Sequence, residues 1–144
     1  MDDPIADLIS QAKTSQQRGK AAEALAHYHK AAARARQSGD LVQLAYCLRH
    51  VSAIALELND NEAALSAGEE AVAIYGECAD DLLGLANALR VTGLAQAAIG
   101  QRVDATACWL EARSLYQQLG IQAGVVEADD WLGATPKEPL PPPL

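Results

Sequence analysis

Apolar residues recur at helical spacing through most of the chain, and no stretch alternates apolar and polar residues for long enough to indicate a strand. This spacing places the apolar side chains on one face of an α-helix. Glycine, asparagine or aspartate interrupts the pattern where a helix end favours a left-handed residue or the next helix needs an N-cap. The interruptions fall at Gly19, Gly39, Asn59, Asp80, Asp81, Gly100 and Gly120.

The interruptions divide the chain into seven predicted helices of similar length. They cover residues 4–18, 20–37, 41–58, 61–77, 82–99, 102–118 and 122–132. Asp3 is the expected N-cap of the first helix, with Pro4 at its first position. After Gly133 comes ATPKEPLPPPL, whose prolines disfavour both helix and sheet. We therefore expect an extended, proline-rich tail over residues 134–144.

The predicted helices repeat along the sequence with two helices in each period. The segments EALAHYHKA (23–31), AALSAGEEA (63–71) and DATACWLEA (104–112) align with spacings of 40 and 41 residues. The helix LAYCLRHVSAIALELN (44–59) likewise matches LANALRVTGLAQAAIG (85–100). An internal period of this length is typical of a stacked helical array. The alanines that align are Ala24, Ala64 and Ala105, and then Ala31, Ala71 and Ala112.

These residues resemble the tetratricopeptide repeat family. Its motif combines small residues where two helices cross, an aromatic residue between two alanines in the second helix, and a glycine near the turn. The aromatic position holds Tyr28 in the first repeat and Trp109 in the third, whereas the middle repeat has Gly68. The period is longer than the family's usual one of roughly 34 residues, which implies longer helices. The resemblance covers about residues 5–132.

The resemblance implies an all-α fold in which antiparallel helix hairpins stack as a short right-handed solenoid. We expect one helical repeat domain over residues 1–133, followed by the tail. Its repeats are predicted at about 4–38, 41–78 and 82–119, with a capping helix at 122–132. Alanine is the most frequent apolar residue and phenylalanine is absent, so the core must form through close approach of helices with small side chains.

Charge and composition narrow the possible partners and the compartment. The formal net charge is −8, which disfavours nucleic acid and anionic membranes as partners. No segment approaches the roughly 20 consecutive apolar residues of a membrane span, and the first ten residues lack the pattern of a secretory signal. Cys47, Cys78 and Cys108 form no CxxC pair and are predicted to be small buried residues. We expect a cytoplasmic protein.

The candidates for chemistry are few. His27 and His29 flank Tyr28, but side chains at i and i+2 of a helix point about 200° apart, so this pair cannot chelate one ion. We predict that both histidines are largely solvated. No GxSxG, P-loop, GxGxxG or HExxH is present. Cys108 has no adjacent basic residue that would lower its pKa. We therefore predict a protein that is not an enzyme, with no catalytic residues, no metal ligands and no cofactor.

The resemblance implies that the first helix of each hairpin lines a concave groove. On these helices an arginine recurs one period apart within A-x-x-L-R, and a guanidinium forms two parallel charge-assisted bonds with a carboxylate. The groove therefore suits an acidic peptide or a free C-terminal carboxylate. By resemblance to peptide-binding members, the binding residues are Lys13, Tyr46, Arg49, His50, Asn87 and Arg90. Alternatively, both arginines pair with glutamates of neighbouring helices.

Three functions remain open at this point. The favoured one is a protein–protein interaction module or scaffold that binds a peptide or a partner protein in the groove. The second is a self-assembling homo-oligomer, in which the tail docks in a neighbour's groove at low entropic cost. Removing residues 134–144 would then reduce the oligomer to a monomer. The third and least favoured is a ligand-sensing regulatory domain, for which the sequence shows no convergent polar cluster.

Overall fold

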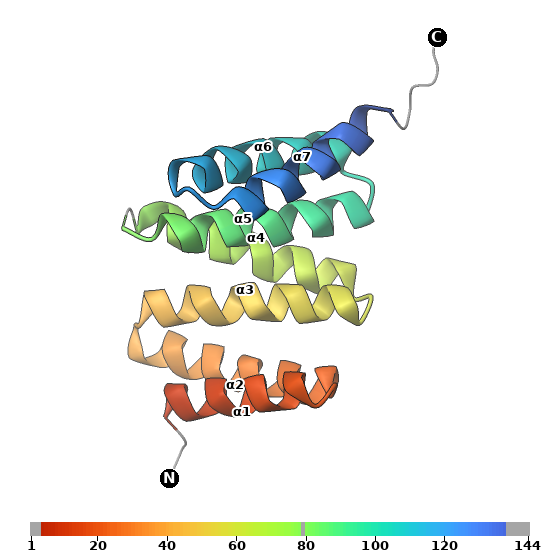
Figure 1. Ribbon diagram of the computed structural model, residues 1–144. Helices are drawn as coiled ribbons and strands as arrows, with labels where there is room; N and C mark the ends of the chain where they lie inside the picture. Colours follow the sequence, from red (N-terminus) through yellow and green to blue (C-terminus); the bar gives the residue numbers. More distant parts are fainter. Residues whose placement is uncertain (1–3, 79, 138–144) are drawn as a thin grey trace.

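The computed structural model describes residues 4–78 and 80–137, which form seven α-helices and no strand. The helices stack in chain order from one end of the molecule to the other, and each packs on the next (Figure 1). This arrangement confirms the predicted all-α array of stacked hairpins. Within the described residues, no helix has the length and apolar character needed to cross a membrane. The helices are α1 (Ile5–Gln17), α2 (Ala21–Ser38), α3 (Leu41–Glu57), α4 (Asn61–Glu77), α5 (Leu82–Ala98), α6 (Arg102–Gln118) and α7 (Gln122–Lys137).

Left-handed residues produce most of the turns between helices. The φ angles at these turns run from 62° at Asn59 to 86° at Gly100. Glycine takes this conformation without a Cβ penalty, and asparagine tolerates it better than most residues do. The predicted interruptions of the helical pattern are therefore confirmed as turns. The glycines concerned are Gly19, Gly39, Gly100 and Gly120.

An aspartate begins each of the three central helices. In each case one carboxylate oxygen accepts a hydrogen bond from a backbone N–H in the first turn, which otherwise has no partner within the helix. The negative charge also lies at the positive end of the helix dipole. The three pairs are Asp40 with Gln43 at 3.1 Å, Asp60 with Ala63 at 3.3 Å and Asp81 with Gly84 at 2.7 Å.

Two helix ends differ from the prediction. α1 begins at Ile5 with Pro4 as its N-cap, while Asp3, the expected cap, lies outside the described residues. α7 continues to Lys137, so residues 134–137 are helical rather than part of an extended tail. A glycine inside a helix costs only about 1 kcal/mol, so Gly133 does not end α7. Residues 138–144, the remainder of the predicted tail, lie outside the described residues.

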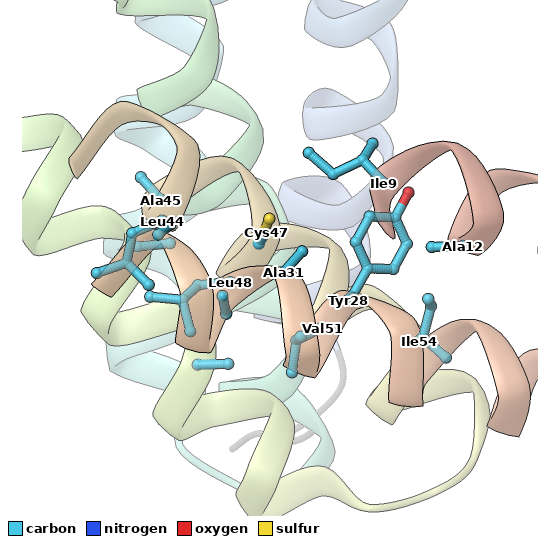
Figure 2. Packing of buried hydrophobic residues seen from close by; sticks show 14 of the residues in the cluster. Ile9, Ala12, Tyr28, Ala31, Leu44, Ala45, Cys47, Leu48, Val51 and Ile54 are labelled. Carbon is cyan, nitrogen blue, oxygen red and sulfur yellow. The ribbon is translucent and has the colours of Figure 1, made fainter. Parts of the chain in front are cut away.

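In the first and third hairpins, the second helix packs an aromatic ring against a small residue of the first helix. Figure 2 shows the ring of Tyr28 in α2 beside Ala12 of α1, and both residues are fully buried. Trp109 of α6 covers Gly93 of α5 so closely that a Cβ on this glycine would lie 2.4 Å from the indole Nε1. The aromatic positions of the repeat therefore fill space that small residues leave open.

The middle hairpin has small residues on both sides of the same contact. A Cβ on Gly68 of α4 would lie 3.1 Å from Oγ of Ser52 in α3 and 2.5 Å from Oγ1 of Thr92 in α5. The Ser52 hydroxyl donates to the Ala64 carbonyl and the Thr92 hydroxyl to the Ala88 carbonyl, both at 2.7 Å. Both buried hydroxyls are thus satisfied. Glycine in place of the aromatic residue brings α4 close to both neighbouring helices.

The three cysteines are free, but they differ in burial. Cys47 is fully buried as predicted, whereas Cys78 and Cys108 are only half-buried. Burial raises the pKa of the Cys47 thiol to about 11. Burial also raises the pKa of Cys108, and the charges of Glu111 and Asp104 act in the same direction. Both thiols are therefore protonated near neutral pH, which disfavours nucleophilic reactivity.

We expect Gly93→Ala to destabilise the fold, because the added methyl group would overlap the packed ring of Trp109. Overpacking of this kind costs about 1–3 kcal/mol. The matched control is Gly76→Ala in the exposed last turn of α4, where a Cβ would meet no atom within 4 Å. That change should stabilise the protein by up to about 1 kcal/mol. Urea denaturation followed by circular dichroism measures both free energies of unfolding, and equal effects would contradict this packing.

Candidate functional site

A cavity of about 430 Å³ opens where α3, α5 and α7, the first helices of successive hairpins, lie side by side. Four of the six predicted binding residues line it, two from α3 and two from α5. α7 contributes Gly124 and Glu127 to the opposite wall, which the sequence analysis did not anticipate. The four predicted residues are Arg49, His50, Asn87 and Arg90.

The other two predicted residues, Lys13 and Tyr46, adjoin this cavity. The Lys13 ammonium lies 5.8 Å from the centre of the Tyr46 ring, and the Arg49 guanidinium lies 5.4 Å from it. The Tyr46 ring also contacts His50, with ring centres 4.5 Å apart. Cations within about 6 Å of an aromatic ring are attracted to its electron-rich face. Lys13, Tyr46, Arg49 and His50 therefore form one group, called here the Tyr46 cluster.

His50 is the neutral member of this cluster. Its ring stacks on Tyr28, with centres 4.8 Å apart and planes 5° from parallel. Burial lowers the pKa of His50 to about 4, and the positive charges of Arg49 and Lys13 act in the same direction. Its Nε2 is covered and has no hydrogen-bond partner among the described residues. Near neutral pH the cluster thus carries its positive charge on Lys13 and Arg49 alone.

Arg49 has no carboxylate partner in the described part of the chain. It is half-buried, and its Nε is covered and makes no hydrogen bond there. Arg49 also lies close to Tyr75. Burial raises the pKa of the Tyr75 phenol, and the positive charge of Arg49 lowers it. The alternative of an ion pair with a neighbouring glutamate therefore does not apply to Arg49 within the described residues.

Arg90 is held by the last helix. Its Nε and Nη2 donate to the two carboxylate oxygens of Glu127 at 2.6 and 3.0 Å. The guanidinium also lies 5.3 Å from the centre of the Trp131 ring, and Trp131 in turn packs against Trp109. At Arg90 the ion pair with a glutamate of another helix is therefore present, and Glu127 occupies the Nε–Nη2 edge that could otherwise bind a ligand's carboxylate.

Asn87 lines the cavity beside Arg90, and a tyrosine of the neighbouring helix fixes its orientation. Its Oδ1 accepts a hydrogen bond from the Tyr116 hydroxyl at 2.5 Å. Burial raises the pKa of Tyr116, so this phenol remains a protonated donor near neutral pH. The carbonyl oxygen of Asn87 is thereby committed to a contact inside the chain.

The remaining histidines lie on α2. His29 is exposed as predicted, but His27 is half-buried, and its Nδ1 is covered without a hydrogen-bond partner among the described residues. The prediction that both are largely solvated is therefore wrong for His27, since one side of α2 at this residue is covered by neighbouring side chains. Among residues 4–78 and 80–137, no three His, Cys, Asp or Glu side chains gather as metal ligands would.

Comparison with known protein families gives a match over half of the chain. The family described as "Tetratricopeptide repeat" matches residues 6–77, which comprise most of the first two hairpins, α1 to α4. No curated protein matches the sequence. The matched region contains three members of the Tyr46 cluster on one helix, α3, and the fourth on α1.

We expect His50 to make the fold less stable in acid. Its pKa is about 4 in the fold and 6.5 as the ordinary value, so the unfolded chain takes up this proton first as the pH falls. The resulting loss of stability begins near pH 6.5 and is complete below about pH 4. It should amount to something on the order of 1–3 kcal/mol. Urea denaturation at several pH values should show this loss in the wild type and not in His50→Gln.

Equal pH profiles for the wild type and His50→Gln would contradict this assignment. The comparison cancels the carboxylates, because both proteins contain the same ones. An NMR titration of the His50 ring provides a direct measurement of the same pKa.

Proposed function

The chain belongs to the tetratricopeptide repeat family, and from this premise we propose that it is a non-catalytic interaction module that binds an acidic peptide segment of a partner protein. Repeats of this family generally mediate protein–protein interaction. The proposed binding surface consists of the Tyr46 cluster and the adjoining cavity between α3, α5 and α7.

The guanidinium of Arg49, which has no carboxylate partner among the described residues, is the observation that carries this proposal. Burying a cation away from its counter-ion is costly, and at this position the described residues offer an aromatic ring instead of a carboxylate. Lys13 places a second positive charge near the same tyrosine ring. A local pair of cations within a chain of net charge −8 supports selection of a negative ligand.

The extent of the surface favours an extended segment over a compact ligand. The cavity involves α3, α5 and α7, and the Tyr46 cluster continues the surface to Lys13 on α1. One strand-like peptide can therefore contact four first helices in succession. Such a peptide gains specificity from side-chain pockets and affinity from charge-assisted hydrogen bonds.

The chemistry of the surface supports binding in place of catalysis. His50 is neutral near neutral pH and its Nε2 is covered without a hydrogen-bond partner among the described residues, so no hydrogen bond of that nitrogen prepares it as a general base. The guanidinium of Arg90 and the carbonyl of Asn87 are both engaged inside the chain. What remains for a ligand is positive charge, an aromatic face and a shallow apolar wall.

Photo-crosslinking in cells tests the proposal. A photoreactive residue at Ala53, which lines the cavity, should form a covalent adduct with the partner. The same residue at Val103 of α6, which is 84% exposed and does not line the cavity, should not. Arg49→Glu should remove the Ala53 adduct, because it replaces the attraction for an acidic segment with repulsion.

Lys30→Glu provides the matched control, since it changes the net charge equally at an exposed position on α2. The adduct should survive this change. Equal adducts at the two labelled positions, or an adduct that persists in Arg49→Glu, would contradict the proposal. An adduct with a second copy of the chain would identify self-assembly instead.

A further inference from the structure

Two arginines occupy equivalent positions in successive repeats, and each lies near a tyrosine of the helix that follows it. Arg49 and Arg90 both end the sequence A-x-x-L-R. Arg49 influences the pKa of Tyr75 in α4, and Arg90 influences that of Tyr116 in α6, one period later. Each tyrosine belongs to the second helix of the hairpin that the arginine's helix begins.

The helices that follow these arginines are also in register. Gly84 near the start of α5 lies beneath the ring of Tyr75, and a Cβ there would be 2.3 Å from it. Gly124 near the start of α7 lies in the same way beneath Tyr116, with a corresponding distance of 2.5 Å. The residue three positions after each glycine therefore has the same register in its helix, and each lines the cavity together with the preceding arginine. These residues are Asn87 and Glu127.

The two positions differ in their aromatic neighbours, Tyr46 beside Arg49 and Trp131 beside Arg90, and in the charge that the following helix supplies. Glu127 gives Arg90 a two-oxygen carboxylate. Asn87 is neutral, and its Oδ1 is engaged by Tyr116. The fold thus contains a filled arginine–carboxylate position and, one repeat earlier, the same position without its carboxylate.

We propose that Arg49 is a binding position for one glutamate side chain of the partner, which takes the role there that Glu127 has at Arg90. This inference rests on the proposed function and specifies its ligand. Arg49 is half-buried on α3, so a carboxylate on a long side chain reaches it while the partner's backbone stays outside. Lys13, which lies near the same Tyr46 ring, adds attraction for the same charge. Arg90 is a positioning residue that fastens α7 through Glu127.

NMR of the arginine Nε–H groups in the full chain provides the test. The probe is a five-residue peptide of alanine and serine with one central glutamate and both ends blocked. Titration with this peptide should move the Arg49 signal and leave the Arg90 signal in place. A second peptide has glutamine at the centre and blocked ends, and a third has glutamine at the centre and a free C-terminal carboxylate. Neither should move the Arg49 signal comparably.

Asn87→Glu supplies the missing carboxylate from inside the chain. In this variant the Arg49 signal should shift toward that of Arg90 without peptide, and affinity for the glutamate peptide should fall by at least about tenfold, since a charge-assisted pair contributes about that much. Because this change also removes the Tyr116 contact, Arg49→Gln is measured in parallel. It should reduce affinity for the glutamate peptide to a similar degree.

Three results would overturn the inference. The glutamine peptide with blocked ends moves the Arg49 signal as far as the glutamate peptide does, the free C-terminal carboxylate alone moves it, or no peptide moves it. In each of these cases a groove adduct at Ala53 that depends on Arg49 would leave the proposed function standing. An Ala53 adduct that is absent from the wild type or persists in Arg49→Glu, together with a positive glutamate titration, would instead contradict the proposed function and retain the glutamate position.

Discussion

Close approach of helices through small side chains is the constraint on which the rest of this structure depends. At the centre of each hairpin the first helix places Ala12, Ser52 or Gly93 against the second. Where the second helix has a ring, the small residue makes room for it, and where it has Gly68, two satisfied hydroxyls occupy the contact. Protein interiors are closely packed and accept few changes in side-chain volume. The contact at the centre of each hairpin therefore also sets the spacing from one helix to the next.

That spacing keeps equivalent residues of successive first helices at equivalent places, which is why the arginine positions are comparable. Arg49 and Arg90 each lie near a tyrosine of the following helix, although their aromatic partners differ, Tyr46 for Arg49 and Trp131 for Arg90. The difference that bears on an anionic ligand is Asn87 against Glu127, because Glu127 binds Arg90 whereas Arg49 has no carboxylate partner among the described residues. In an array of repeats, function can therefore arise where one unit omits a contact that another makes.

Much of the fold could be predicted because its signals are local. Left-handed turns at Gly39 and Asn59 and the N-cap at Asp40 depend on residues a few positions apart. The end of α7 was not predicted, since Gly133 weakens a helix without stopping it. The six site residues were predicted by resemblance, but the partner of Arg90 lies 37 residues away on α7. The alignment of Gly124 with Gly84 would have indicated Glu127 as this partner. That alignment depends on contacts of both glycines with tyrosine rings of other helices, which the sequence does not show.

The electrostatics of the Tyr46 cluster explain how an uncompensated cation can persist in this fold. A guanidinium without a counter-ion is costly in proportion to its burial, and Arg49 is only half-buried, so water shares its solvation. The Tyr46 ring offsets part of the desolvation cost that remains for Arg49. Because His50 is neutral, it adds no third positive charge beside Lys13 and Arg49. Binding of an anion would therefore stabilise the Arg49 guanidinium further. Arg90 already has the carboxylate of Glu127, so an added anion would stabilise it less. The difference between these two arginines is therefore the physical basis for placing the ligand at the earlier repeat.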